Sequence, residues 1–277
     1  MKRFSLELLY HIVGIGSASG LFFKDGTLFI ASDNAGYLYE FNTTSQLLTK
    51  TRLLETETLE NIPKKKKPDF EAVAERDGKL YLFGSGSTSN RNTVYMMDLA
   101  SRDVSNLDLS PLYFQMQRMS GIGEDNFNLE GAIATDQGWL LFQRGNGEGG
   151  NNGIFKVVGS LDAFKNVAYF PVELPKIKHV RSSFTDAILV GDAIWFLATA
   201  EDTDSTYHDG DVLGSLIGKI NLHTFDVHYA EQITDFQKFE GLTLFAQTDN
   251  TITFLLCEDN DTDLMESGIF KLTLTLD

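Results

Sequence analysis

The chain has 277 residues, 42% of them hydrophobic, with 39 acidic and 23 basic residues and a formal net charge of −16 at pH 7. This apolar content is typical of a folded globular protein and excludes a chain that stays disordered. The acidic surface repels phosphates and anionic headgroups, so we expect no nucleic-acid partner and no attachment to a membrane.

The N-terminal segment has the character of a β-strand. Residues 4–12 read FSLELLYHI, and Glu7 and His11 interrupt the apolar run that a signal peptide would need. No run of about 18 apolar residues is found that would span a bilayer. The one cysteine, Cys257, excludes an intramolecular disulfide and suits a reducing compartment. We therefore expect a cytoplasmic protein, and we expect it to be a monomer.

A short motif, which we call the anchor, recurs five times along the chain. Its copies are SASGLF (17–22), DFEAVA (69–74), NLEGAI (128–133), SFTDAI (183–188) and KFEGLT (238–243). The third residues of successive anchors are 52, 59, 55 and 55 residues apart. Repeats of about this length are typical of β-propellers, in which each repeat forms one blade.

Each anchor is followed by further strand-like runs, rich in β-branched and aromatic residues and bounded by Gly, Asp and Asn. In the first repeat these runs cover residues 26–32, 36–42 and 47–54. The fifth repeat lacks its last run, and residues 4–12 have the matching character. We therefore predict one all-β domain over residues 1–277, a five-bladed β-propeller with four-stranded antiparallel blades. The N-terminal strand is predicted to pair in the last blade, which closes the ring and removes an open sheet edge.

Two other folds are compatible with this pattern. A β-sandwich or barrel could contain hairpins that resemble one another by accident, and a solenoid could stack the same repeats with open ends. The segment at residues 59–68, LENIPKKKKP, is predicted to be a long loop between the first and second blades.

The third residue of each anchor is expected in the central channel, since the first strand of a propeller blade lines the axis. These residues are Ser19, Glu71, Glu130, Thr185 and Glu240. Glutamates crowded in a narrow channel repel one another, and a bound cation removes that cost. Oxygen donors suit calcium, and no His or Cys stands at an anchor to favour zinc or copper. We therefore expect a Ca²⁺ ion on the axis; the alternative is that each glutamate only caps a strand end or binds a backbone amide.

The anchors and their order resemble those of the five-bladed calcium-activated nucleotidases, or apyrases. In that family one Ser or Glu from each blade surrounds a central calcium, and KFEGLT (238–243) is similar to the motif of the last blade. Thr185 stands where the family has Ser, and the adjacent Asp186 is a further candidate ligand. The anchors also resemble those of phytase-like and gluconolactonase-like propellers, so the resemblance implies an ion site more strongly than one reaction.

Several residues are candidates for binding an anionic substrate at the same mouth of the channel. Lys67 ends a run of four lysines in the predicted loop, and Arg144 ends a strand that faces the channel. Other candidates lie in the polar loops of that face: Asp33, Arg118 and Arg181. The alternative for each of them is a solvated surface charge.

Two functions follow from these features. The first is a calcium-dependent hydrolase of phosphate esters or anhydrides, with Glu130 and Arg144 as candidate catalytic residues and a small anionic molecule as substrate. The second is a noncatalytic propeller in which the ion holds the blades together and the mouth binds a ligand or a partner protein.

Overall fold

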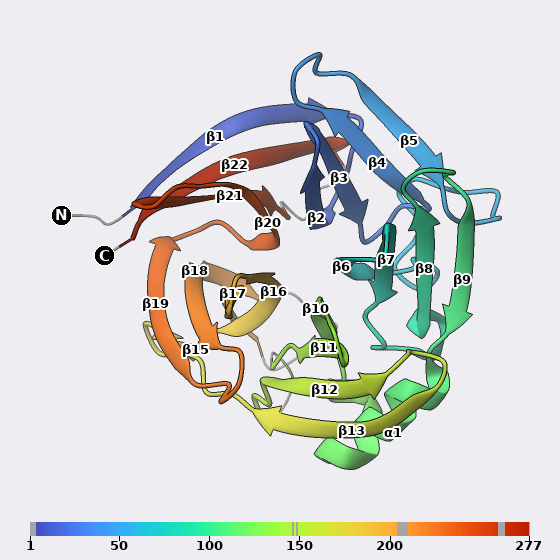
Figure 1. The fold of residues 1–277 in the computed structure, drawn as a ribbon, viewed down its shortest axis with the longest axis vertical. Helices are drawn as coiled ribbons and strands as arrows, with labels where there is room; N and C mark the ends of the chain where they lie inside the picture. The colour runs from blue at the N-terminus through green and yellow to red at the C-terminus, as the bar shows by residue number, and fades with distance from the viewer. Residues whose placement is uncertain (1–3, 146, 148, 204–209, 260–263, 277) are drawn as a thin grey trace.

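The structure is a computed structural model that describes residues 4–145, 147, 149–203, 210–259 and 264–276. Five sheets of four antiparallel strands are arranged like blades around a central channel (Figure 1). The predicted five-bladed propeller is confirmed, and with it the assignment of one repeat to each blade. Among the described residues, no helix has the length and apolar character that crossing a bilayer requires.

Within blades 1 to 4, the strands follow one another outward from the channel in chain order. Blade 1 contains β2 (Ala18–Lys24), β3 (Thr27–Ser32), β4 (Tyr37–Asn42) and β5 (Leu48–Arg52). Blade 2 contains β6 (Phe70–Arg76), β7 (Lys79–Gly84), β8 (Thr93–Asp98) and β9 (Val104–Asp108). Blade 3 contains β10 (Leu129–Thr135), β11 (Gly138–Gln143), β12 (Gly153–Gly159) and β13 (Phe164–Pro171). Blade 4 contains β16 (Ser183–Val190), β17 (Ala193–Asp202), β18 (Asp211–Asn221) and β19 (Val227–Thr234).

Blade 5 closes the ring with the first strand of the chain. It contains β20 (Phe239–Gln247), β21 (Thr251–Glu258), β22 (Glu266–Thr275) and, as its outer strand, β1 (Phe4–Val13). β1 and β22 are antiparallel and paired from Phe4 opposite Leu274 to Val13 opposite Glu266. The predicted closure by the N-terminal strand is therefore confirmed.

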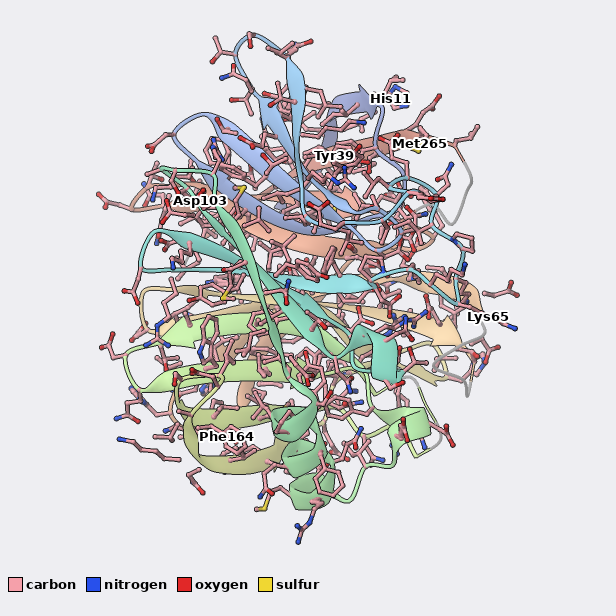
Figure 2. All side chains as sticks on the ribbon, turned by 90° about the vertical axis from the view of Figure 1, so that its right-hand side faces the viewer. His11, Tyr39, Lys65, Asp103, Phe164 and Met265 are labelled. Atoms are coloured by element: carbon pink, nitrogen blue, oxygen red, sulfur yellow. The ribbon has the colours of Figure 1, made fainter. Side chains whose placement is uncertain are left out.

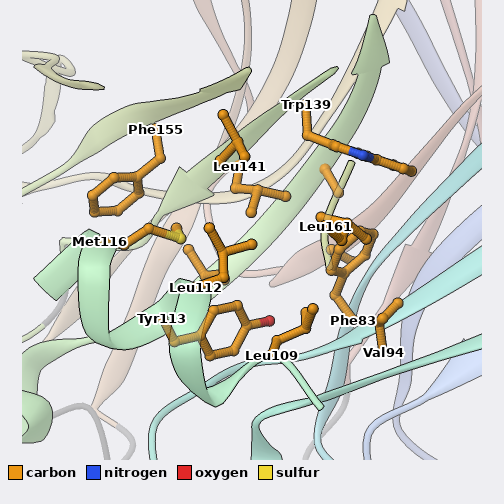
Figure 3. Close-up of a cluster of buried hydrophobic side chains, with 14 of the residues drawn as sticks. Phe83, Val94, Leu109, Leu112, Tyr113, Met116, Trp139, Leu141, Phe155 and Leu161 are labelled. Carbon is orange, nitrogen blue, oxygen red and sulfur yellow. The ribbon is translucent and has the colours of Figure 1, made fainter. Parts of the chain in front are cut away.

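Hydrophobic clusters fill the wedges between neighbouring blades. Each of the five clusters formed by the described residues combines side chains from two adjacent blades. The cluster between blades 2 and 3 is the one drawn in Figure 3, where Phe83 of β7 lies near Trp139 and Leu141 of β11. These wedges fix the angle between blades and therefore the geometry of the channel.

A helix outside the repeat pattern completes this cluster. Helix α1 (Ser110–Ser120) lies between blades 2 and 3 and was not predicted. It has a proline in its first turn and ends at Gly121, which adopts φ 73° and donates its N–H to the carbonyl of Gln117. Leu112, Tyr113 and Met116 lie on its buried face. The 59-residue interval between the second and third anchors, the longest of the four, contains this insertion.

The two faces of the ring carry different segments. A small hairpin, β14 (Lys176–Ile177) with β15 (Val180–Arg181), precedes blade 4 and was also not predicted. The predicted loop at residues 59–68 contains no helix or strand. In the side view, Lys65 of this loop lies at one face of the ring, and Asp103 of the β8–β9 turn lies toward the other (Figure 2). The Lys65 face is the mouth at which the inner strands begin.

Candidate cation site at the channel mouth

The inner strand of every blade has a β-bulge at the third residue of the anchor. The antiparallel pairing of the first and second strands skips the third anchor residue in each blade: Ser19, Glu71, Glu130, Thr185 and Glu240. A bulge leaves one residue without a pairing partner and redirects its side chain. The five positions selected from the sequence are therefore structurally equivalent.

Three of these residues, Glu71, Glu130 and Glu240, line a single cavity of about 340 Å³ at the channel mouth. Their side chains are buried, with 8%, 1% and 4% of their surface exposed. The described residues contribute six carboxylates and five basic side chains to its wall. The carboxylates are Asp33, Asp69, Glu71, Glu130, Glu240 and Asp259, and the basic side chains are Lys64, Lys67, Arg91, Arg144 and Lys238. The protein's own cations thus offset most of the acid charge.

One wall of the cavity is an ion-pair cluster of Asp33, Lys67, Asp69 and Arg91, which we call the Lys67 cluster. The Lys67 ammonium pairs with Asp33 and lies 2.8 Å from Asp69 Oδ1. Arg91 lies 2.8 Å from the other oxygen of Asp69, which also accepts a hydrogen bond from Ser85. Burial favours a protonated Asp69, but Lys67 and Arg91 outweigh it and hold the pKa of Asp69 below its usual value. Burial raises the pKa of Asp33 to about 6, with Lys67 acting in the opposite direction.

Glu71 stands beside this cluster without a partner of its own. Its carboxylate has no hydrogen bond and no ion pair within the part of the chain that the structure describes. One oxygen from each of Asp33, Asp69 and Glu71 lies within 4.8 Å of the other two. Burial, followed by the charges of Glu130 and Asp69, raises the pKa of Glu71 well above its usual value. The free carboxyl is therefore the group that gains most from a bound cation.

The opposite wall is a second ion-pair network, the Lys238 cluster. It consists of Glu130, Arg144, Glu201, Lys238, Glu240 and Asp259. Lys238 Nζ lies 3.0 Å from Glu240 Oε1, 3.1 Å from Asp259 Oδ2 and 3.3 Å from Glu201 Oε1. Arg144 bridges Glu130 at 3.0 Å and Glu201 at 2.6 Å. Lys238 therefore already holds one oxygen of Glu240, the anchor glutamate of blade 5.

Three buried oxygen atoms without a donor belong to residues of the cavity wall. Asp33 Oδ1, Asn128 Oδ1 and Glu130 Oε2 have no hydrogen-bond partner among the described residues. All three residues line the cavity, as does Glu71. A buried acceptor without a donor is costly, and a ligand that supplies positive charge or several donors would satisfy all of these atoms together.

The remaining anchor residues bind backbone groups of the neighbouring blade. The Ser19 hydroxyl of blade 1 donates to the Phe70 carbonyl of blade 2. The Thr185 hydroxyl of blade 4 donates to the Phe239 carbonyl of blade 5 at 2.6 Å. Asp186 accepts the N–H of Leu242 at 2.7 Å, and its pKa is raised well above the usual value because it is buried. None of Ser19, Thr185 and Asp186 is among the described residues that line the cavity.

The predicted substrate-binding residues separate in space. Asp33, Lys67 and Arg144 line the cavity. Arg118 is exposed on α1, and its guanidinium carbon lies over the Phe114 ring, 5.9 Å from the ring centroid. It is absent from the described lining of the cavity. Arg181 lies on β15 and lines a different cavity of about 510 Å³.

Several residues of the site did not emerge from the repeat pattern. Asp69, Asn128 and Lys238 each stand two residues before an anchor glutamate, at the first position of the motif. That position was readable as a recurring polar residue in DFEAVA, NLEGAI and KFEGLT. Glu201 lies near the end of β17 and Asp259 directly follows β21, and the polarity of these segments was the available signal.

Comparison with solved structures places the fold among propellers of diverse activity. Glutaminyl cyclase from Myxococcus xanthus is similar with a TM-score of 0.58 and 12% identity, over 98% of this chain and 97% of that chain. The major allergen Mala s 1 from Malassezia sympodialis gives 0.56 and 9%, over 98% and 97%. The PQQ-bound aldose sugar dehydrogenase from Streptomyces coelicolor gives 0.56 and 12%, over 98% of each chain. At these identities the likeness concerns the fold alone.

None of these three proteins is a nucleotidase or a phytase, so the resemblance to those families rests on the anchor motifs. Among curated proteins, no sequence matches this chain. A family model does match it, over residues 14–274, which include all five anchors. The chain therefore belongs to the family of unknown function DUF6929.

Proposed function

We propose that the channel mouth binds a divalent cation, Ca²⁺, and that the protein is a cation-dependent hydrolase of phosphate esters or anhydrides. The observation that carries the proposal is the set of buried oxygen atoms without a donor on the cavity wall. Asp33, Asn128 and Glu130 supply these atoms. Glu71 adds a buried carboxylate beside them, and one oxygen from each of Asp33, Asp69 and Glu71 lies within 4.8 Å of the other two.

The chemistry of this donor set fits calcium. Carboxylate and amide oxygens are hard donors, and calcium accepts six to eight of them in flexible geometry. The described lining of the cavity contains no histidine and no cysteine, the donors that zinc and copper prefer. Glu71 and Asp33 would lose their elevated pKa on binding, because a divalent charge stabilises their ionised forms.

The basic side chains around the cavity support a phosphate substrate. When bound, the ion would polarise a phosphoryl oxygen. Lys64, Lys67 and Arg91 lie on the same wall and could balance the remaining charge of the substrate. Glu130 and Arg144 are 3.0 Å apart on the opposite wall, where Arg144 is positioned to contact an anion and Glu130 to accept a proton from water.

The alternative, a noncatalytic propeller with a structural ion, has less support from the blade contacts. Ser19, Thr185 and Asp186 already link neighbouring blades by direct hydrogen bonds to the backbone. Lys238 links Glu201 of blade 4 to Glu240 and Asp259 of blade 5 by ion pairs. An ion is therefore not needed to hold these blades together, and its role would be to bind and activate a ligand.

Calorimetric titration with CaCl₂ after treatment with a chelator tests the cation site. We expect one site per chain in the wild type and an affinity at least about tenfold lower in Glu71→Gln, because this change removes one formal charge from the coordinating set. Glu75→Gln is the matched control, since Glu75 lies on the same strand and is absent from the described lining of the cavity. Absence of calcium binding in the wild type would overturn the proposal.

Release of inorganic phosphate from a panel of nucleotides, sugar phosphates and inositol phosphates tests the reaction. We expect turnover that requires calcium and is lost in Glu130→Gln. If the wild type binds calcium with none of these substrates being hydrolysed, the noncatalytic alternative replaces the hydrolase.

A further inference from the structure

We propose that Lys67 is a tethered counter-ion which the metal ion displaces, and that its released ammonium then binds the anionic group of the substrate. This inference rests on the proposed function in one respect, because it takes Asp33, Asp69 and Glu71 as the cation site. It adds a residue that makes metal binding and anion binding depend on each other.

Lys67 occupies the place that a metal ion would need. Its Nζ pairs with Asp33 Oδ2 and lies 2.8 Å from Asp69 Oδ1, and these two residues with Glu71 form the close group of carboxylates. An ammonium and a divalent ion cannot share the same carboxylate oxygens without strong repulsion. Glu71, 8% exposed and without a partner among the described residues, shows that Lys67 and Arg91 together leave this group incompletely neutralised. A divalent ion would neutralise it more fully.

The contacts of Lys67 and Arg91 indicate which of the two bases would move. Arg91 is held by Asp69, by the Ser87 hydroxyl at 2.7 Å and by the Lys64 carbonyl at 2.7 Å. Within the part of the chain that the structure describes, the Lys67 ammonium pairs with the two aspartates only. A lysine side chain is long and flexible, whereas the planar guanidinium of arginine is fixed by its geometry. Lys67 is therefore the base that exchanges with the ion.

The backbone around Lys67 would allow the side chain to move alone. The N–H groups of Lys66 and Lys67 donate to the Pro63 carbonyl at 2.7 and 3.0 Å, which closes a turn. Arg91 fixes the same turn through the Lys64 carbonyl. The ammonium would then leave the aspartates while its Cα stays at the rim, so it remains within reach of an anion bound in the cavity.

Reciprocal coupling follows from this exchange. Calcium frees Lys67 for an anion, and an anion that holds Lys67 leaves the aspartates to calcium, so each ligand raises the affinity for the other by the same factor. Such couplings typically amount to about 5- to 150-fold.

Titrations with CaCl₂ and with methylphosphonate, a phosphate mimic that cannot be hydrolysed as an ester, test the coupling. In the wild type we expect calcium to tighten methylphosphonate binding by about fivefold or more. In Lys67→Met we expect calcium to bind about fivefold or more tightly than in the wild type, because the competitor is gone, and the coupling to be lost. Lys66→Met is the matched control, an exposed lysine of the same turn that is absent from the described lining; it should leave both affinities unchanged.

Lys67→Arg is a second variant that tests the exchange if Lys67→Met fails to fold. It keeps the charge and can bind carboxylates in a bidentate manner, so calcium affinity should fall below that of the wild type. If wild type and Lys67→Met bind calcium equally well, the exchange is overturned and the cation site stands. If Lys67→Met binds calcium more tightly but the coupling persists, the anion role is overturned. Absence of calcium binding in the wild type and in Lys67→Met overturns the proposed function as well.

Discussion

Glu201 shows how strongly a single residue can depend on its ionic partners. Burial would raise the pKa of its carboxyl, but Arg144 and Lys238 outweigh burial and lower it. Both partners are themselves buried, with side chains 8% and 6% exposed. Removal of one member of a buried ion pair leaves the others uncompensated, so the neutral variant costs more than a surface pair would.

We expect Glu201→Gln to lower the free energy of unfolding by roughly 3–5 kcal/mol at pH 7. Because the folded pKa lies below the ordinary value of 4.5, the stabilisation is present above that value and is lost as the pH falls through the folded pKa. The difference from the wild type should therefore shrink as the pH falls below 4.5 and through the folded pKa. Urea titrations at several pH values measure it, and Glu55→Gln, in a pair with Arg52 where Glu55 is 92% exposed, should cost no more than about 1 kcal/mol.

At the scale of single elements, the inner strands and helix α1 differ in how far the sequence determines them. The bulge falls at the third anchor residue in all five inner strands. In every anchor a Gly or Ala follows the bulged residue by one or two positions. The strands and their order could be predicted because the repeats encode them. Helix α1 occurs once, so it contributes no repeat, and only the longer interval between anchors indicates it.

At the candidate site too, the repeated residues could be predicted from the sequence, and the pairing of the residues outside the repeat could not. Glu71, Glu130 and Glu240 were identified because they occupy one repeated position, and all three line the cavity. The basic residues Lys67, Arg144 and Lys238 of the same cavity come from three different parts of the repeat, and no periodicity predicts which base reaches which acid. A repeat pattern determines the backbone position of a residue, whereas an ion pair depends on where the charged groups of several long side chains lie.

Helix α1 is expected to stabilise the wedge between blades 2 and 3. Leu112 is 1% exposed in the cluster with Leu141 and Phe155, so Leu112→Ala should cost about 2–5 kcal/mol of unfolding free energy. Thermal denaturation measures this loss. Phe114→Ala is the control, since Phe114 is 61% exposed on the same helix and its loss should leave the melting temperature nearly unchanged. Equal losses in the two variants would show that the helix does not act through its buried face.

At the scale of the whole molecule, ring closure unites residues from the two ends of the chain. β1 covers the outer edge of β22, and Ile12 packs in the cluster that joins blades 5 and 1. Without β1, blade 5 would present an unpaired edge, which is a template for pairing with other chains.

A variant that lacks residues 1–13 should melt at a lower temperature and form soluble aggregates in size-exclusion chromatography. A peptide of residues 4–13, FSLELLYHIV, added in trans should restore the elution volume of the full-length protein and raise the melting temperature. A peptide of the same composition in scrambled order is the control. Rescue by both peptides, or by neither, would contradict a specific closure by β1.

The closing strand also has a consequence for biosynthesis. β1 is made before the other strands of the propeller, but its partner β22 begins at Glu266, so most of the propeller must leave the ribosome before the two can pair. At about 5–20 residues per second, this delay is on the order of ten seconds or more. Throughout that time the ten residues of β1 lack their pairing partner, and their backbone hydrogen-bonding groups stay exposed. Cotranslational chaperones that shield extended segments should therefore contact β1 early, and closure of the ring joins the first strand of the propeller to the last in chain order.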